Sequence, residues 1–225
     1  MLHSRHVLAA AAIAAIGLMP ATASAQVVKN GGFESPTVAG CCNTAPPDSV
    51  DFWTVTSGNV NVVNGQFNGT DTSGPNLAAE GNQYLDLVGQ GGTGSIVQTL
   101  LGLTPGVVYN LTFDYSNNGF TPSSSTSASA GFSIDDLIGT VTHNTANSTD
   151  LDWRVFSGSF TATGNDVLSF ANATGGRNEG VLLDAISVAP VPEPATWAMM
   201  LLGFGGIGMA VRRRRKQHSS LPQFA

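Results

Sequence analysis

Paired carboxylates are the first residues of this chain whose types suggest chemistry. Asp135 and Asp136 are adjacent, and two carboxyl groups about 5–9 Å apart can cleave a glycosidic bond as acid and base. Neighbours in a strand point to opposite faces, so this pair favours a solvated turn over an acid/base site. His143 is the only histidine between Gln26 and Pro190, which leaves no histidine pair for zinc. We therefore predict that the protein is not an enzyme; a hydrolase whose site no motif reveals stays an alternative.

A glycine-rich motif suggests a second kind of chemistry. The residues from Gly89 to Gly94 match the pattern G-x-G-x-x-G of dinucleotide-binding sites. The phosphates in such sites lie at a helix N-terminus. Here Ser95–Thr99 follows, which is strand-like, and Pro105 closes the run. We therefore predict a flexible hairpin loop instead of a nucleotide site.

The elements that must position these residues have the pattern of strands. Short β-branched and aromatic runs are separated by clusters of Gly, Pro, Asn and Ser. Leu111 and Phe113 alternate with Thr112 and Asp114, as in a strand with one buried face. The pattern predicts ten strands: Val50–Thr56, Asn59–Val63, Gln83–Val88, Ser95–Leu101, Val107–Tyr115, Ser129–Ile134, Leu137–Thr142, Trp153–Thr163, Val167–Asn172 and Gly180–Val188. The expected fold class is all-β, a single β-sandwich of the jelly-roll type.

Charge distinguishes the middle of the chain from its ends. Between Gln26 and Pro190 there are fourteen acidic residues and three cations, a net charge of −11 against −6 for the whole chain. The length of this stretch suits one domain with a single core. A nucleic-acid partner needs a basic surface, so we expect no nucleic-acid binding. An acidic surface suits divalent cations or neutral polymers, and it also keeps exported proteins soluble.

Residues 1–25 have the pattern of a signal peptide. Arg5 precedes the alanine-rich apolar run Val7–Leu18, and Ala23-Ser24-Ala25 has the small-x-small pattern of a cleavage site. The run is shorter than the roughly 20 residues that span a bilayer. We predict cleavage between Ala25 and Gln26, with a retained N-terminal anchor as the alternative.

The C-terminal end of the chain, residues 191–216, combines three features. They are the triplet Pro192, Glu193 and Pro194, an apolar segment over about 195–211, and a basic cluster of Arg212, Arg213, Arg214, Arg215 and Lys216. A basic cluster keeps its side of a membrane helix in the cytoplasm, together with the short tail 217–225. This order closely resembles the PEP-CTERM sorting signal of Gram-negative bacteria.

That resemblance implies a route for the protein. It implies export, a transient transmembrane anchor in the inner membrane with a cytoplasmic C-terminus, and cleavage near Pro192–Pro194 by an exosortase. The final location would be the cell surface or the extracellular matrix.

The domain over residues 26–190 also resembles a known group. Its sequence blocks are Asn30–Glu34, Trp53–Val60, Ala79–Leu87, Pro105–Phe113 and Leu182–Val188. They follow one another as in the bacterial "choice-of-anchor" exported proteins and a related plant cell-wall family of unknown function. The resemblance implies a galactose-binding-like jelly roll akin to carbohydrate-binding modules. The pattern often ends in two acids, whereas here Ala185 follows Asp184.

A structural Ca²⁺ is the cofactor that this resemblance implies, because related carbohydrate-binding jelly rolls commonly join their first and last strands through one. Glu34 follows the first strand and Asp184 lies in the last, so both could converge on such an ion. Calcium takes six to eight oxygens, so backbone carbonyls near Val28–Asn30 would have to contribute. The alternative is an acid at a turn and a hydrogen-bonded aspartate.

Two aromatic residues are the expected glycan contacts. Sugar recognition usually places an aromatic ring against a pyranose, with polar neighbours that fix its orientation. Trp153 adjoins Asp152 and Arg154, and Phe120 borders a polar loop, whereas Trp53 is expected in the core. The expected function is a non-catalytic module that binds extracellular polysaccharide. The alternative is a purely structural or adhesive surface protein without a glycan site.

Overall fold

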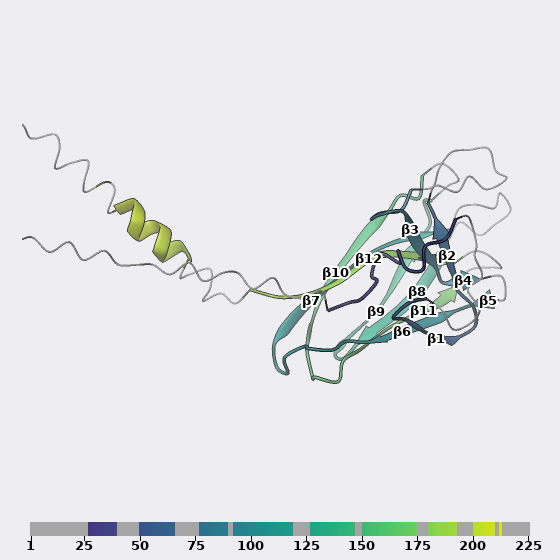
Figure 1. Cartoon of the computed structure of the whole chain (residues 1–225), viewed down its shortest axis with the longest axis horizontal. Helices are drawn as coiled ribbons and strands as arrows, with labels where there is room; N and C mark the ends of the chain where they lie inside the picture. The colour runs from purple at the N-terminus through teal and green to yellow at the C-terminus, as the bar shows by residue number, and fades with distance from the viewer. Residues whose placement is uncertain are drawn as a thin grey trace, which may run out of the picture.

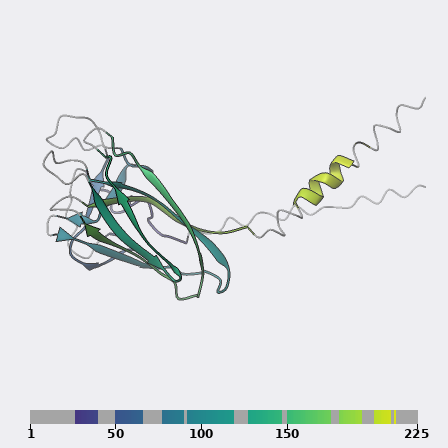
Figure 2. The same cartoon turned by 180° about the vertical axis from the view of Figure 1, so that it is seen from behind.

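The computed structural model describes residues 27–39, 50–65, 77–89, 92–118, 127–146, 150–174, 180–192, 200–209 and 212. Figures 1 and 2 show from opposite sides that the domain consists of two facing β-sheets. Several residues with predicted roles lie outside the described residues: Ala25, Gln26, Phe120, Glu193, Pro194, Arg213, Arg214, Arg215 and Lys216.

Each of the two sheets has five strands, and most neighbours in a sheet are not consecutive in the chain. The first sheet has the order β1 (Thr54–Ser57), β6 (Ser95–Thr99), β11 (Val167–Thr174), β8 (Ala128–Ile134) and β9 (Leu137–His143). The second sheet has the order β10 (Arg154–Thr161), β7 (Val108–Asn117), β12 (Val181–Pro190), β3 (Gln83–Asp86) and β2 (Asn61–Asn64). The predicted all-β sandwich is confirmed.

The glycine-rich motif forms a small hairpin, as predicted. Strand β4 (Val88–Gly89) pairs with β5 (Gly92–Thr93), and Gly92 has a φ of +128°, which favours glycine. The next element, β6, is a strand, whereas a dinucleotide site needs a helix at that point.

Phe113 of β7 lies among the aromatic rings of the core between the two sheets. Its ring is fully buried, and its centroid lies 4.8 Å from that of Phe156, 5.0 Å from Phe170 and 5.4 Å from Phe132. Phe113 is buried because alternate residues of β7 face the first sheet, while their neighbours face away. Trp53 is 3% exposed and packs against Phe170, so its predicted core position is confirmed.

The two sides of the sandwich have edge strands of different length. On one side the sheets end in β1 and β2, with four residues each. On the other side they end in β9, with seven residues, and β10, with eight, and these two strands contact each other. The sandwich therefore has long edges on one side only.

The apolar C-terminal segment is helical over residues 200–209. Within the part of the chain that the structure describes, no helix has the length and apolar character needed to cross a membrane. The predicted membrane helix over 195–211 includes residues outside that part, so it stays a prediction.

Candidate functional site

The outer face of the second sheet carries its own apolar cluster. Leu85 of β3 and Leu183 of β12 belong to the main core, so Tyr84 and Leu182, their neighbours in sequence, point away from it. We call the buried residues on this face the outer cluster: Val63, Tyr84, Ala146, Leu151 and Leu182. This cluster is the base on which the candidate site is built.

Trp153 packs on the outer cluster and remains partly exposed. Its ring meets that of Tyr84 edge to face, with centroids 5.6 Å apart. Its Nε1 donates a hydrogen bond to the carbonyl oxygen of Leu77 at 3.0 Å. These two contacts fix the orientation of the indole while part of its surface faces solvent.

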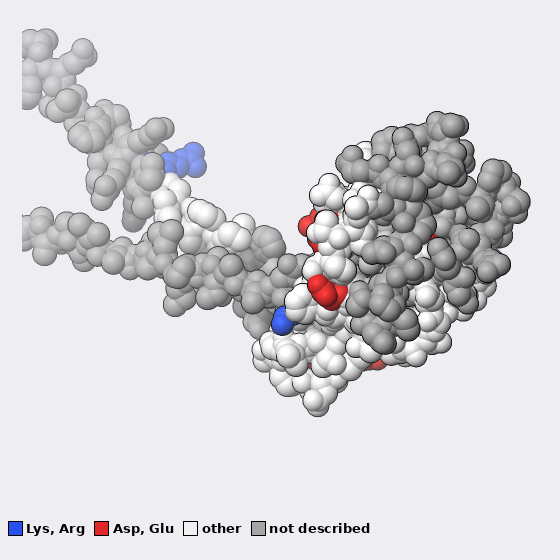
Figure 3. Space-filling model, turned by 45° about the vertical axis from the view of Figure 1, so that its right-hand side comes forward, with Lys and Arg blue, Asp and Glu red and all other residues white. Residues whose placement is uncertain are grey.

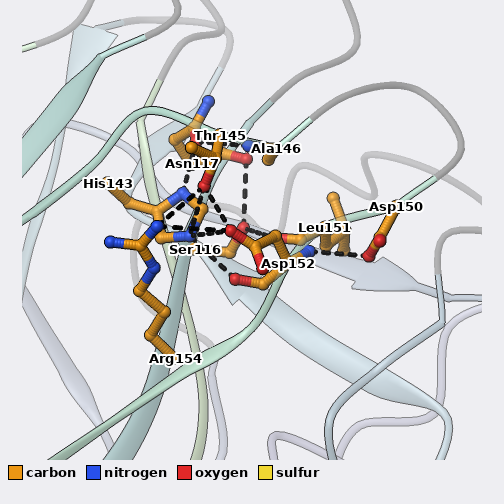
Figure 4. A network of polar contacts seen from close by, with 9 residues as sticks. All are labelled: Ser116, Asn117, His143, Thr145, Ala146, Asp150, Leu151, Asp152 and Arg154. Carbon is orange, nitrogen blue, oxygen red and sulfur yellow. Dashed lines mark hydrogen bonds and ion pairs between the residues drawn. The ribbon is translucent and has the colours of Figure 1, made fainter.

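Two charged side chains flank Trp153 in sequence, and a third side chain joins them (Figure 4). Arg154 Nη2 lies 3.4 Å from Asp152 Oδ2 and donates to Thr145 Oγ1 at 3.1 Å. The Thr145 hydroxyl donates a short hydrogen bond to Asp152 Oδ2. That bond, followed by the charge of Arg154, holds the pKa of Asp152 below its usual value. Asp152 is therefore charged at neutral pH.

His143 of β9 binds the segment that contains Asp152 from inside the domain. The imidazole is fully buried. Its Nδ1 lies 2.6 Å from Asn117 Oδ1, and its Nε2 lies 2.8 Å from the carbonyl oxygen of Asp152. Burial lowers the pKa of His143, and the charge of Arg154 lowers it further. The neutral ring thus connects β7, β9 and the segment before β10.

Four carboxylates accompany the outer cluster, and three of them, Asp184, Asp114 and Glu80, interact with one another. Asp184 of β12 lies opposite Asp114 of β7 in the ladder, and Glu80 raises the pKa of both. Burial is the larger cause in each case, and it raises the pKa of Asp184 to about 7.

Asp184 fixes a loop to β12. Its Oδ2 accepts hydrogen bonds from the backbone N–H groups of Ala79 at 2.8 Å and Glu80 at 2.9 Å, and its Oδ1 accepts one from Ala185 at 2.7 Å. A bulge in β12 between Asp184 and Ser187, where Ala185 has a φ of +49°, allows the last contact. The side chain therefore satisfies three backbone donors at once.

Glu34 approaches the same region from the N-terminal segment. Its Oε1 accepts hydrogen bonds from the N–H groups of Asn82 at 2.6 Å and Gln83 at 2.8 Å. A Cβ placed on Gly32 would lie 3.7 Å from Asp184 Oδ1 and 4.0 Å from Glu34 Cγ. The structure thus brings Glu34 and Asp184 to the same glycine. The expectation that Glu34 follows the first strand is wrong, because residues 27–39 form no strand and Glu34 precedes β1.

The oxygens around Gly32 do not form a calcium shell by themselves. Among the described residues, no group of three or more His, Cys, Asp or Glu side chains could hold a metal ion. The nearby carbonyl of Asn30 already accepts from Phe33 N–H at 3.2 Å, and that of Gly31 from Ile186 N–H at 3.0 Å. Calcium takes six to eight oxygens, so calcium binding by Glu34 and Asp184 stays a prediction.

The adjacent acids Asp135 and Asp136 lie in the turn between β8 and β9, as predicted. Asp136 Oδ1 accepts a hydrogen bond from Thr161 N–H at 3.1 Å. Burial, followed by the hydrogen-bonded carboxyl group of Asp166, raises the pKa of Asp135 to about 6. The pair therefore connects the β8–β9 turn to the end of β10 and to Thr163 in the loop after it.

Sequence reasoning missed Glu80 and Asp86 as members of the outer face. Asp86 is 3% exposed, accepts Val88 N–H at 2.8 Å and Asn118 Nδ2 at 2.8 Å, and has a pKa raised to about 7 by burial. Its position two residues after Tyr84 was a usable signal, because both then lie on one face of β3. Glu80 gave no such signal, since it lies in a loop.

The fold and the outer face together define a jelly-roll domain with a fixed, partly exposed indole among charged groups. The family model described as "Protein of unknown function (DUF642)" matches residues 26–189, and the chain belongs to this family. The model of the PEP-CTERM protein-sorting motif matches residues 190–215. The predicted sorting signal is thereby confirmed, and it indicates export and sorting to the surface.

Solved structures resemble this chain. A Stig cyclase from Fischerella sp. TAU, in complex with (3Z)-3-(1-methyl-2-pyrrolidinylidene)-3H-indole, has a TM-score of 0.52 at 18% identity over 74% of this chain and 97% of the cyclase. TmCBM61, in complex with beta-1,4-galactotriose, has a TM-score of 0.47 at 17% identity over 75% of this chain and all of that protein (100%). At 18% identity, the likeness to the cyclase shows the fold alone. No curated protein matches the chain.

Proposed function

We propose that this chain is a non-catalytic, polysaccharide-binding protein of the bacterial cell envelope or extracellular matrix. The observation that carries the proposal is the environment of Trp153. Its indole is held by Tyr84 and by the carbonyl of Leu77, yet it stays partly exposed. A ring held in this way loses little conformational entropy when a sugar stacks on it.

The side chains around the indole suit hydroxyl groups. Asp152 offers carboxylate acceptors and Arg154 offers guanidinium donors, and about half of each side chain is exposed, at 45% and 46%. A sugar can exchange hydrogen bonds with both while its apolar face covers the ring. The acidic domain as a whole favours a neutral polysaccharide over a polyanion.

Titration of exopolysaccharide purified from the producing bacterium into the full chain in detergent tests the proposal. Trp153→Ala is expected to weaken binding about tenfold, which corresponds to about 1.4 kcal/mol. Trp153→Phe keeps a ring face and should retain part of the affinity, which separates stacking from any loss of folding. Phe52→Ala is the matched control, because Phe52 is an aromatic residue 61% exposed next to Lys29, away from the site.

Three outcomes would overturn the proposal. Absence of binding by the parent chain would favour a structural or adhesive surface protein. Equal binding by Trp153→Ala and the parent would place any glycan site elsewhere. Cleavage of the polysaccharide by the parent would make the protein an enzyme.

We propose also that an exosortase removes the anchor near Pro192–Pro194, after a transient stage in the inner membrane with the C-terminus in the cytoplasm. The matched sorting motif supports this, together with Arg212 and the four basic residues that follow it. Intact-mass measurement of protein from the cell surface should find a chain that ends near the Pro-Glu-Pro triplet. A surface chain that still contains Phe204 would contradict the proposal.

A further inference from the structure

The outer edge of β10 has the features of a strand that pairs with another strand. Edge strands expose unpaired backbone groups, and natural proteins commonly guard them by shortness, by charge or by proline. β1 and β2 are short. β10 has eight residues, and after Arg154 at its start it contains neither charge nor proline. This edge lacks the usual protection.

One hydrogen bond shows which backbone groups of β10 point outward. Thr161 N–H donates to Asp136 Oδ1 at 3.1 Å, so it points away from β7. Backbone direction alternates along an antiparallel ladder. The N–H and C=O groups of Val155, Ser157 and Ser159 therefore also point outward. Among the described strands, none pairs with this edge of β10.

The side chains along this edge are uncharged. Val155 is 70% exposed, and Ile138 on the neighbouring strand β9 is 75% exposed. In the view of Figure 3, uncharged atoms also make up most of the described surface of the sandwich. Because the domain carries a net charge of −11, two copies repel each other least where an uncharged edge meets its equivalent.

The charges at the two ends of β10 identify the partner. Arg154 lies at the N-terminal end, with a side chain 46% exposed, and the exposed Asp136 lies beside Thr161 at the other end. The strand rise places these ends about 23 Å apart. When two β10 strands pair antiparallel, Arg154 of each copy lies near Asp136 of the partner subunit. A second copy of this chain therefore offers opposite charge at both ends of the edge.

We propose that the domain self-associates by antiparallel pairing of β10 with β10 of a second copy, which joins the two second sheets into one continuous ten-stranded sheet. The interface is isologous, so each interaction occurs twice. The outward groups of Val155, Ser157 and Ser159 supply the central hydrogen bonds. Arg154 and Asp136 set the register.

Sedimentation equilibrium of the full chain in detergent tests the proposal. The parent should show a concentration-dependent dimer. Val155→Lys introduces a charge into the edge twice per dimer, and the dimer Kd should rise at least about tenfold. Val167→Lys is the matched control, because Val167 is a valine 44% exposed in the interior strand β11 of the other sheet. The Val167→Lys variant should have the same dimer Kd as the parent.

A charge exchange tests the choice of partner. Arg154→Glu and Asp136→Arg should each weaken the dimer, and the double variant should restore it, because the two charges then meet in reversed order. Hydrogen exchange of peptides containing Ser157 and Ser159 should slow as the parent concentration rises. Near-ultraviolet circular dichroism checks that each variant is folded.

The results that overturn the proposal are distinct. They are a parent that is monomeric at every concentration, a dimer that Val155→Lys does not weaken, or a double variant that stays as weak as the single ones. The first outcome would leave the β10 edge available to a different extended peptide. None of these results depends on polysaccharide binding.

Discussion

The two faces of the second sheet are built from the same strands but bury different chemistry. On the inner face Phe113 and Leu183 pack into an apolar core. On the outer face Tyr84 and Leu182 share their surroundings with the buried carboxylates Asp86 and Asp184. The inner face is stabilised by apolar burial, which is independent of pH. The outer face also depends on whether its acids are protonated. One sheet thus combines a pH-independent side with a pH-dependent one.

A cavity should lower the free energy of unfolding more on the inner face than on the outer face. This is the largest effect we expect. Phe113→Ala removes a ring that packs against four other aromatic rings, and should lower the free energy of unfolding by about 3–5 kcal/mol. Leu182→Ala in the smaller outer cluster should cost about 2–3 kcal/mol. Urea denaturation measures both, with Val167→Ala as an exposed control. Equal losses for Phe113→Ala and Leu182→Ala would remove the distinction between the faces.

Stability should fall as the pH rises from about 5 to about 8. Burial raises the pKa of Asp86 and of Asp184 to about 7, well above the usual 3.8 of an aspartate. The folded state therefore binds more protons than the unfolded state between these pH values. The stability that the protonated acids contribute is lost as the pH rises through 7. For Asp86 the difference amounts to about 4 kcal/mol at most.

Substitutions locate the source of this pH dependence. Asp86→Asn should flatten the slope of stability against pH, whereas Phe113→Ala should lower the whole curve and leave the slope unchanged. Thermal melts from pH 4 to pH 9 measure both. A parent that is more stable at pH 8 than at pH 5 would show that the buried acids are not protonated in the folded state.

Calcium binding would stabilise the outer face and leave the packing of the inner face unchanged. If Glu34 and Asp184 hold an ion, calcium at about 100 times its Kd should add about 2.7 kcal/mol of stability. The pKa of Asp184 should then fall, and Asp184→Asn should abolish the effect. Melting midpoints with calcium and with a chelator give the result. Equal midpoints would leave Asp184 only as an acceptor for backbone N–H groups.

The sequence predicted the strands well because their cause is local. Alternation around Phe113 and turn residues between runs gave all ten expected strands, each of which overlaps an observed strand. Only the short β4–β5 hairpin was not predicted as a separate pair of strands. Burial in this sandwich follows directly from which residues share a face.

The site was predicted less completely because its contacts join distant parts of the chain. Trp153 was identified by type, but its hydrogen bond to Leu77 and its contact with Tyr84 depend on how β3 and the segment before β10 meet. Asp184 was placed in the last strand correctly. The bulge that lets it accept from Ala185, and the loop that brings Ala79 and Glu80 to it, leave no mark in the sequence.

The end at which the chain leaves the sandwich has a consequence for assembly. Val191 N–H bonds to Val108 C=O at 3.0 Å, and Val108 pairs with Thr161, so the exit lies beside the C-terminal end of β10. Under the proposed anchoring, copies held in one membrane would all have this end nearest the lipid, and their β10 strands would run parallel. An antiparallel pair needs one copy inverted, so such a membrane-bound population would not form it, whereas copies in separate detergent micelles can. Cutting the anchor would then do more than release the protein: it would permit the rotation on which pairing depends.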